Sequence, residues 1–401
     1  MEQSINLKIL TNKIIFTVSL LIFSRIGFFI PIPGLDHDSL YYNVSRNGFV
    51  NFLNIISGGG FSTLGIFALG IGPYINASIM IQALSKTLPS LQKLREDGGN
   101  GYRKINQITR YLATGLAFMQ SIGILIWIKP YVFDWNLYFI FETITCLITG
   151  STIIMWIGEL ISEQGIGNGQ SLLIFQNIIA SIANNLLSTL FFNYNNSSFK
   201  LVITLSVSFF LMSIITIFIQ EAKRKVLLIS TRQLGKEINI SNYLPLKFNY
   251  LGVMPLILSS SIMNFLNYKF LYFFQYNKIF FLILYYLLII TFSYIQSFII
   301  LDPEEISKNL KKMGTNIPTV RPGEATTDYL KIILNRLTFL GANYLCIIAS
   351  IPSIISIITK TPNVTGLGVT TLFILINVTA DTVKEIKIYK ISQKYETMNK
   401  N

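Results

Sequence analysis

Few residues in this chain have the types and spacings that catalysis requires. Gly165, Gly167 and Gly169 resemble a dinucleotide-binding loop, but the G-x-G-x-x-G spacing is absent and the pattern predicts no strand before them. The segment from Asp97 to Lys104 is rich in glycine and basic residues, but it lacks the G-K-[ST] ending of a phosphate-binding loop. We therefore expect no nucleotide site and interpret the chain as a protein that is not an enzyme.

The composition is typical of a membrane protein. Apolar residues make up 51% of the chain and charged residues only 13%, with a mean hydropathy of +0.54, whereas soluble proteins have roughly 25% charged residues. Cys146 and Cys346 lie inside apolar runs and are interpreted as small hydrophobic residues. No spacing of Cys and His predicts a metal site, and no cofactor is expected. The first apolar run, Ile14–Ile30, is long enough to span and shows no signal-peptide cleavage site.

The stretch from Phe52 to Leu84 has the pattern most suggestive of function. A short apolar piece breaks at three consecutive glycines, and an apolar run follows that carries Pro73, Asn76, Ser78 and Gln82. The first piece is too short to cross a bilayer, which takes about 20 residues. Broken backbone at membrane depth requires burial in protein or a water-filled cavity. We expect a re-entrant half-helix followed by a spanning helix, and the alternative is an interfacial hairpin before an ordinary spanning helix.

Ionisable side chains inside apolar runs mark the positions where a transporter would bind its coupling ions. The candidates are Arg25, Glu142, Glu159 and Asp381, and all but Arg25 lie near the ends of their runs. A proton-coupled transporter normally needs a carboxylate or histidine near the midplane, and the lack of one argues against that class. We expect Arg25 to pair with a carbonyl at a helix end rather than to take part in transport.

Apolar runs bounded by charged residues, Gly or Pro predict about ten spanning helices. Basic residues concentrate in alternate loops, and the positive-inside rule then places both termini on the same, positive side of the membrane. The two longest polar segments, 221–248 and 302–329, fall on that side. We expect them to project as hairpins that a soluble partner grips, and the alternative is solvated linkers. The expected spans are 13–30, 68–88, 109–129, 137–158, 166–190, 199–220, 249–267, 278–301, 330–351 and 366–388.

Three blocks of sequence resemble one known family. The block from Ile66 to Leu84, IFALGIGPYINASIMIQAL, and the block from Ser162 to Phe175, SEQGIGNGQSLLIF, are similar to the two signatures of SecY, the central subunit of the bacterial and plastid protein-conducting channel. The block from Asn316 to Leu330, NIPTVRPGEATTDYL, resembles its large cytosolic loop. The blocks occur in family order, and the apolar segments match from about Lys13 to Glu396.

The resemblance implies an all-α polytopic fold in two inverted five-helix halves with a re-entrant plug. The N-terminal half occupies 1–220 with helices 1–5 and the plug near 52–64, and helix 6 begins the second half at about 199. Residues 221–401 hold helices 7–10. The implied function is to pass unfolded polypeptides across the membrane and to release apolar segments laterally into lipid. The alternative is a secondary transporter with inverted repeats, and a weaker one is an insertase without a channel.

By the same resemblance, aliphatic side chains form a pore ring that blocks ions when the channel is idle. Gln170 falls where some relatives have a further isoleucine, so it would interrupt this ring if it faces the pore; the alternative is that it points into the helix bundle and bonds a backbone carbonyl. The residues of the ring are Ile71, Ile75, Ile174, Ile257 and Ile374.

The resemblance also assigns a plug below the ring and a lateral gate between helices 2 and 7. The gate would be held by modest hydrogen bonds, whereas each serine could instead bond to the preceding turn of its own helix. The plug residues are Phe52, Leu53, Ile56, Gly58, Gly59, Gly60 and Phe61, and the gate residues are Asn76, Gln82, Ser259, Ser260, Ser261 and Asn264.

The implied partners are a SecE-like small membrane subunit, preprotein substrates, membrane lipid, and a driver that is the SecA ATPase, a ribosome or both. The driver would dock on the loop with Arg321, Pro322 and Gly323. Direct nucleic-acid binding is expected only toward ribosomal RNA. The many Ile, Asn, Lys, Phe and Tyr residues and the short loops are similar to plastid-encoded relatives. We therefore expect a chloroplast thylakoid location with both termini in the stroma, and the alternative is a bacterial plasma membrane.

Overall fold

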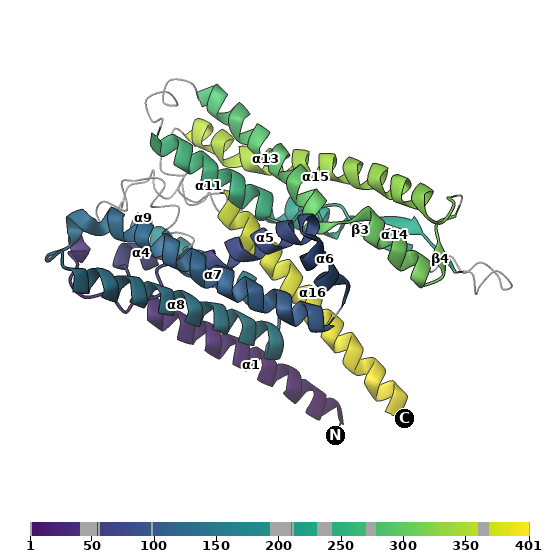
Figure 1. Cartoon of the computed structure of the whole chain (residues 1–401), viewed down its shortest axis with the longest axis horizontal. Helices are drawn as coiled ribbons and strands as arrows, with labels where there is room; N and C mark the ends of the chain where they lie inside the picture. Colours follow the sequence, from purple (N-terminus) through teal and green to yellow (C-terminus); the bar gives the residue numbers. More distant parts are fainter. Residues whose placement is uncertain are drawn as a thin grey trace. The chain divides into compact units, whose positions relative to one another are not determined.

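The described part of the chain is mostly helical and also contains two short antiparallel strand pairs (Figure 1). The computed structural model describes residues 2–40, 54, 57–97, 99–192, 210, 212–230, 243–269, 278–318, 320–359 and 369–400. The helices are α1 (Glu2–Phe28), α4 (Gly60–Thr63), α5 (Gly72–Thr87), α6 (Pro89–Glu96), α7 (Gly99–Ile128), the 3₁₀ turn η1 (Lys129–Tyr131), α8 (Leu137–Gln164), α9 (Gly169–Phe192), the short Met212–Glu221, α11 (Met254–Lys269), α13 (Lys278–Ile300), α14 (Pro303–Lys312), α15 (Glu324–Thr359) and α16 (Val369–Lys400). The strands are β1 (Lys223–Leu227), β2 (Ile229–Ser230), β3 (Tyr243–Lys247) and β4 (Thr315–Asn316).

Two compact units make up the chain. The first consists of Met1–Phe199 together with Val378–Asn401, and the second of Lys200–Asn377. The first boundary lies where the sixth spanning helix is expected to begin, and the second lies within α16. The division into halves at residue 220 stays a prediction.

In the first unit, α8 packs against α1, α7 and α9, and α7 packs against α5 and α6. Burial of their apolar faces is the main stabilising term. One cluster of buried side chains surrounds Leu64, Ile128 and Leu147, and a second surrounds Phe28 and Ile154. Both clusters include residues from the irregular segment before α5, which is thereby fixed against α1 and α8.

The turn between α8 and α9 contains the second signature block. Asn168 caps α9, because its Oδ1 accepts from the backbone N of Gln170 at 3.1 Å and of Ser171 at 3.4 Å. Ser162 donates to the carbonyl of Gly158 and accepts from the backbone N of Gly169, both at 2.9 Å. A Cβ at Gly169 would lie 2.0 Å from that carbonyl. Glycine is therefore required where the two helix ends meet.

The segment before α5 differs from the expected span. The sequence predicts a helix from residue 68, but α5 begins at Gly72 with Ile71 as its N-cap. Pro73 lies in the first turn, where its missing N–H needs no partner. The turns before Gly72 therefore belong to the irregular segment and not to the spanning helix.

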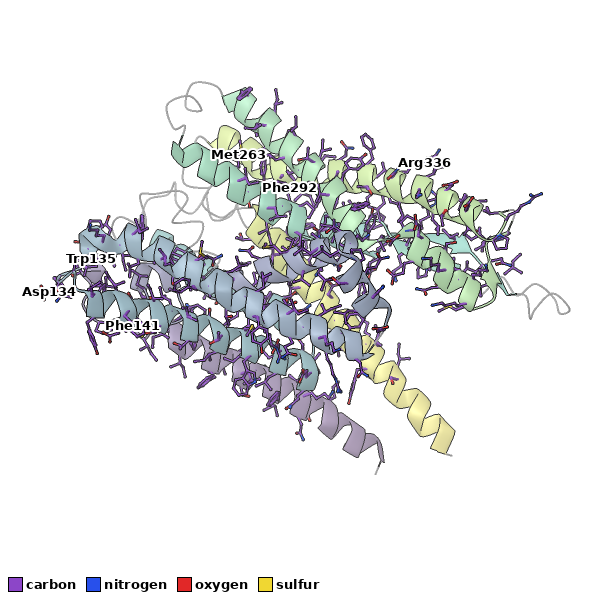
Figure 2. All side chains as sticks on the ribbon, viewed as in Figure 1. Asp134, Trp135, Phe141, Met263, Phe292 and Arg336 are labelled. Atoms are coloured by element: carbon purple, nitrogen blue, oxygen red, sulfur yellow. The ribbon has the colours of Figure 1, made fainter. Side chains whose placement is uncertain are left out.

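Five helices in the described part of the chain are long and apolar enough to cross a membrane. They are Leu10–Phe28, Gly99–Tyr131, Leu137–Gln164, Leu282–Lys312 and Glu324–Ile351, bounds that join some adjacent elements. A helix occupies part or all of each of the ten expected spans. How many of them cross stays a prediction. Large apolar side chains point outward from these helices, as Phe141 of α8 does in Figure 2.

In the second unit, α13 packs against α11 and α15 around buried side chains that include Leu256, Ile289 and Leu345. A cluster of three hydroxyls joins these elements near one end. Tyr250 is hydrogen-bonded to Ser297 and to Thr338, and Ser297 and Thr338 lie 2.8 Å apart. This cluster ties the segment before α11 to α13 and α15.

The two long polar segments contain short strands and the helix α14 in their described residues. Strands β1 and β3 pair antiparallel with Lys223 opposite Lys247, and β2 pairs with β4. Strand β4 follows α14, so the second pair joins segment 221–248 to segment 302–329. Val226, Leu246 and Ile317 are buried in a cluster with residues of α15. The described part of the chain is mostly helical with short strands in these segments, and a pairing between distant segments is not visible in local sequence.

Candidate functional site

The candidate pore residues of the first unit lie together. Ile71 is 4% exposed and belongs to the cluster that contains Tyr74 and Leu173, and Ile75 and Ile174 are half-buried against it. A Cβ at Gly158 would lie 3.3 Å from the Cδ1 atoms of both Ile71 and Leu173. The absence of a side chain at Gly158 therefore lets the backbone of α8 pack closely against Ile71 and Leu173.

Gln170 lies in the first turn of α9 and is half-buried. Its side-chain amide lies close to the hydroxyl of Tyr74 in α5. The amide thus adds a polar link between α5 and α9 beside Ile71, Ile75 and Ile174. Sequence reasoning identified Gln170 but not its partner, because an aromatic residue in an apolar helix carries no pairing signal of its own.

The remaining two ring candidates belong to the second unit. Ile257 is half-buried near the start of α11, and Ile374 is 4% exposed in the first turns of α16. Their membership of one ring with the residues of the first unit stays a prediction.

The candidate plug contains a helix end followed by the short helix α4. The backbone N of Gly59 donates to the carbonyl of Asn54 at 2.8 Å, and Gly58 has φ 66°. This is the 6→1 bond of a helix that ends in a left-handed glycine. Gly60 and Phe61 lie in α4, and a Cβ at Gly60 would lie 2.8 Å from the ring of Phe28. The candidates Phe52, Leu53 and Ile56 lie outside the described residues.

Arg25 holds this helix end. Its Nη1 donates to the carbonyl of Gly58 at 2.7 Å, which confirms the expectation of a pair with a helix-end carbonyl. The guanidinium carbon also lies 5.7 Å from the ring centre of Phe28 and 4.9 Å from that of Phe29. A charge within an apolar helix is thus satisfied by one carbonyl and two aromatic faces.

Further contacts fix the same segment between α1 and α9. Thr63 donates its hydroxyl to the carbonyl of Phe28 at 3.1 Å, and the backbone N of Ile32 donates to the carbonyl of Leu64 at 3.1 Å. Asn177 of α9 is 4% exposed and lies directly against Gly58. Sequence reasoning missed Asn177, because an isolated amide in an apolar run signals a polar contact without indicating which segment provides it.

The lateral-gate candidates divide into two kinds. Asn76 and Gln82 are exposed on α5. Ser259 and Ser260 are buried in α11, and they donate to the carbonyls of their own helix at 2.7 Å and 3.0 Å. The back-bonding alternative therefore holds for these two hydroxyls. The side chains of Ser261 and Asn264 lie outside the described part of the chain.

The driver-loop candidates lie between β4 and α15. Arg321 and Pro322 are exposed, and Gly323 has φ 115°. Thr326 donates its hydroxyl to the carbonyl of Arg321 at 2.8 Å, and Ser307 of α14 donates to the carbonyl of Gly323 at 3.3 Å. These two hydrogen bonds fix the backbone of the loop, and the guanidinium of Arg321 stays accessible to a partner.

The chain is similar to known proteins in both sequence and fold. The SecY family model matches residues 65–383. A protein translocase subunit SecY of Pyropia yezoensis is 52% identical, covering 98% of each chain. Two solved structures share the fold at 16% identity: a SecY protein whose plug domain stabilises the closed channel and maintains a membrane seal (TM-score 0.63, 95% of this chain and 92% of that one), and Sec61 in the canine ribosome–channel complex (0.61, 95% and 93%).

These matches identify the fold and the family together. The identity to the Pyropia protein extends over nearly the whole chain, and the structural likeness extends over the same length. The chain therefore belongs to the SecY family and is a multi-pass membrane protein, the protein-conducting channel subunit of a Sec translocase and not an enzyme.

Proposed function

We propose that this channel passes unfolded polypeptides through an aliphatic constriction. Ile71, Ile75 and Ile174 would contribute from the first unit, and Ile257 and Ile374 from the second. The observation that carries the proposal is the grouping of the first three isoleucines around one buried cluster. A narrow aliphatic ring expels water when idle and offers no fixed partner to a passing chain. A secondary transporter would need a carboxylate near the membrane midplane to couple ions, and the carboxylates in the apolar runs of this sequence lie near the ends of those runs.

The segment from Ser57 to Leu64 is proposed as part of the plug that closes the idle channel. Its support is the set of contacts with α1 and α9, above all the bond between Arg25 and Gly58. Glycines at positive φ supply the two points where the backbone could hinge when the plug leaves. The plug of the matched SecY structure has the same role.

Asn76 and Gln82 remain candidates for the lateral gate through which apolar segments enter lipid. Exposed amides on a spanning helix require water or a polar partner, since lipid offers neither. Such groups would favour a closed seam by modest hydrogen bonds, on the order of 0.6 kcal/mol each. Ser261 and Asn264 would supply polar groups on the opposite side, since the hydroxyls of Ser259 and Ser260 bond to their own helix.

The driver is proposed to dock on the polar end of the second unit. Exposed basic residues gather there on the paired strands and on α14, with Arg321 on the neighbouring loop. An arginine can form a bidentate pair with a carboxylate or phosphate. This chemistry suits the SecA ATPase and ribosomal RNA alike, and the matched Sec61 channel is bound to a ribosome. The exposed basic residues are Lys223, Arg224, Lys225, Lys247, Lys308, Lys311 and Lys312.

We further propose ten crossings in two inverted halves, a SecE-like subunit that clamps them, and a thylakoid location with both termini in the stroma. The loop charge asymmetry supports the orientation. The high identity to the Pyropia protein supports a plastid origin. Co-purification with mass spectrometry tests the partners, and recovery of neither a small membrane subunit nor a driver would contradict this assignment.

Reconstitution tests the proposed function directly. The chain with its small subunit and driver should protect a preprotein from external protease inside vesicles. The same vesicles without driver should not accumulate amino acids or ions against a gradient. Solute accumulation without preprotein protection would instead support the transporter alternative.

A further inference from the structure

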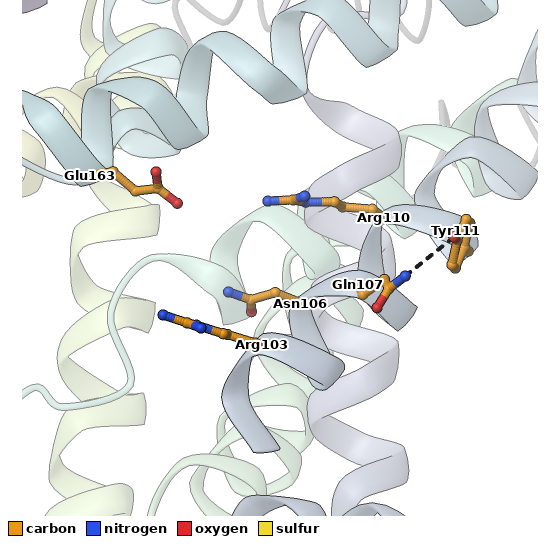
Figure 3. A pocket seen from close by; sticks show the side chains of 6 residues that line it. All are labelled: Arg103, Asn106, Gln107, Arg110, Tyr111 and Glu163. Atoms are coloured by element: carbon orange, nitrogen blue, oxygen red, sulfur yellow. Dashed lines mark hydrogen bonds between the residues drawn. The ribbon is translucent and has the colours of Figure 1, made fainter. Parts of the chain in front are cut away.

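A polar cavity lies between α7 and α8 of the first unit, apart from the candidate constriction. Its volume is about 370 Å³, and its lining residues are Arg103, Asn106, Gln107, Arg110, Tyr111 and Glu163. Figure 3 shows Arg103, Asn106 and Arg110 pointing from α7 toward the side on which Glu163 projects from α8, whereas Tyr111 lies on the opposite side.

Helix lengths place this cavity in the headgroup layer of the membrane. Helix α7 has 30 residues and α8 has 28, whereas the hydrocarbon core needs about 20. Counting about 20 residues back from Ile128 reaches Thr109, and the same count forward from Leu137 reaches Trp156. Tyr111 and Trp156 are 69% and 60% exposed near these positions, as expected for aromatic residues at the interface.

The charged side chains that line the cavity are balanced once Glu159, the ion-pair partner of Arg110, is counted with them. Arg110 donates through Nε to Glu159 at 2.8 Å, and the Glu159 side chain is only 14% exposed. Arg103 and Glu163 then contribute one further charge of each sign. Within the described part of the chain, neither of them, nor Asn106, has a hydrogen-bond or ion-pair partner for its side chain. The open cavity thus offers donors from Arg103 and Asn106 and an acceptor from Glu163.

The near-equal positive and negative charge at the cavity favours some lipid headgroups over others. An acidic headgroup would meet the carboxylate of Glu163 and gain little net attraction. A quaternary ammonium is recognised by aromatic faces, and the ring of Tyr111 lies away from Glu163 (Figure 3). A sugar suits the site, because its hydroxyls both donate to a carboxylate and accept from guanidinium and amide groups.

We propose that this cavity binds the headgroup of a glycolipid, an uncharged and hydroxyl-rich lipid. The headgroup would bridge Arg103 and Asn106 of α7 and Glu163 of α8, with its acyl chains along the exposed apolar surface beside Trp156. The lipid would join the ends of two helices that are otherwise linked here by the Arg110–Glu159 ion pair.

Native mass spectrometry of the purified full-length channel tests this site. Digalactosyl diacylglycerol should bind more tightly than phosphatidylglycerol or phosphatidylcholine. Glu163→Gln should weaken digalactosyl diacylglycerol about fivefold, because a charge-assisted hydrogen bond becomes a neutral one. The same change should strengthen phosphatidylglycerol, because a repelling charge is lost. Opposite shifts for the two lipids are the expected result.

Lys104→Gln is the matched control, since Lys104 is an exposed neighbour on α7 that does not line the cavity. It should leave digalactosyl diacylglycerol binding unchanged. Tighter binding of phosphatidylglycerol or phosphatidylcholine by the unmodified protein would overturn the glycolipid assignment. Equal binding of all lipids by the unmodified protein and by Glu163→Gln would overturn the site itself. Displacement by free galactose at the same concentration as the lipid would overturn the lipid assignment in favour of a soluble sugar.

Discussion

Arg25 is expected to hold the plug in its closed position. Replacing Arg25 with Leu removes the donor of the 2.7 Å bond to the carbonyl of Gly58 and the cation beside Phe28 and Phe29. A hydrogen bond from a charged group contributes about 1.5–3 kcal/mol, and each cation–π contact about 0.5–1 kcal/mol. Because neighbouring terms are not additive, we take about 2–4 kcal/mol for the whole loss.

That loss would shift the closed-to-open ratio of the plug by roughly 30-fold to several hundredfold, since each 1.4 kcal/mol is about tenfold. Single-channel recording of the idle channel in planar bilayers measures the shift as an increase in open probability. Arg25→Lys keeps the charge but loses the planar guanidinium, so its effect should be intermediate. Phe29→Leu removes one aromatic contact only and should raise the open probability about two- to fivefold.

A thermal melt accompanies each recording, because a misfolded channel could also leak. If Arg25→Leu keeps the melting temperature within a few degrees and the idle open probability equals that of the unmodified channel, Arg25 does not hold the plug. If Phe29→Leu raises the idle open probability as much as Arg25→Leu does, the guanidinium of Arg25 is not the main group that holds the plug.

Three further changes test the other proposed sites. Arg321→Glu should abolish driver-dependent translocation while leaving the folded channel and its small subunit intact, and normal export by this variant would remove Arg321 from the docking site. Gln170→Ile should dry the constriction and lower the resting conductance; unchanged conductance with a lower melting temperature would show that Gln170 stabilises the helix bundle and does not face the pore. Replacing Asn76 and Gln82 with Leu should change the hydrophobicity a segment needs to enter lipid, which a graded Leu/Ala series measures, and an unchanged threshold would count against the gate.

Local sequence was sufficient for the helices and for some of the site. Long apolar runs predicted a helix in each of the ten expected spans, because length and apolarity are local properties, whereas α6 and α14 lie in polar stretches outside those spans. The pairing of Arg25 was also predictable, since a lone charge in an apolar run must find a partner. The glycines at 165, 167 and 169 were recognised from the sequence only as part of a family signature, and the structure shows that Gly169 allows close contact with the carbonyl of Gly158.

Contacts between distant segments were not predictable in the same way. Glu159 was expected only to lie near the end of its apolar run, and in the structure it pairs with Arg110, 49 residues earlier, with its side chain 14% exposed. The pairing of β2 with β4 and the contact of Asn177 with Gly58 depend likewise on how helices pack. The start of α5 at Gly72 is an intermediate case, because Pro73 favours a first-turn position that the apolar run alone does not mark.

The most direct test of the account asks whether a translocating polypeptide touches the proposed constriction. After Cys146→Ser and Cys346→Ser, single changes Ile75→Cys and Ile174→Cys provide probes at the ring, and Ile126→Cys, at a position that is 67% exposed on α7, provides the control. A preprotein stalled during driver-dependent transport and carrying one cysteine should form disulfide cross-links with both ring positions and not with the control. Cross-linking to Ile126→Cys alone, or to none of the three while transport proceeds, would contradict a path through this ring.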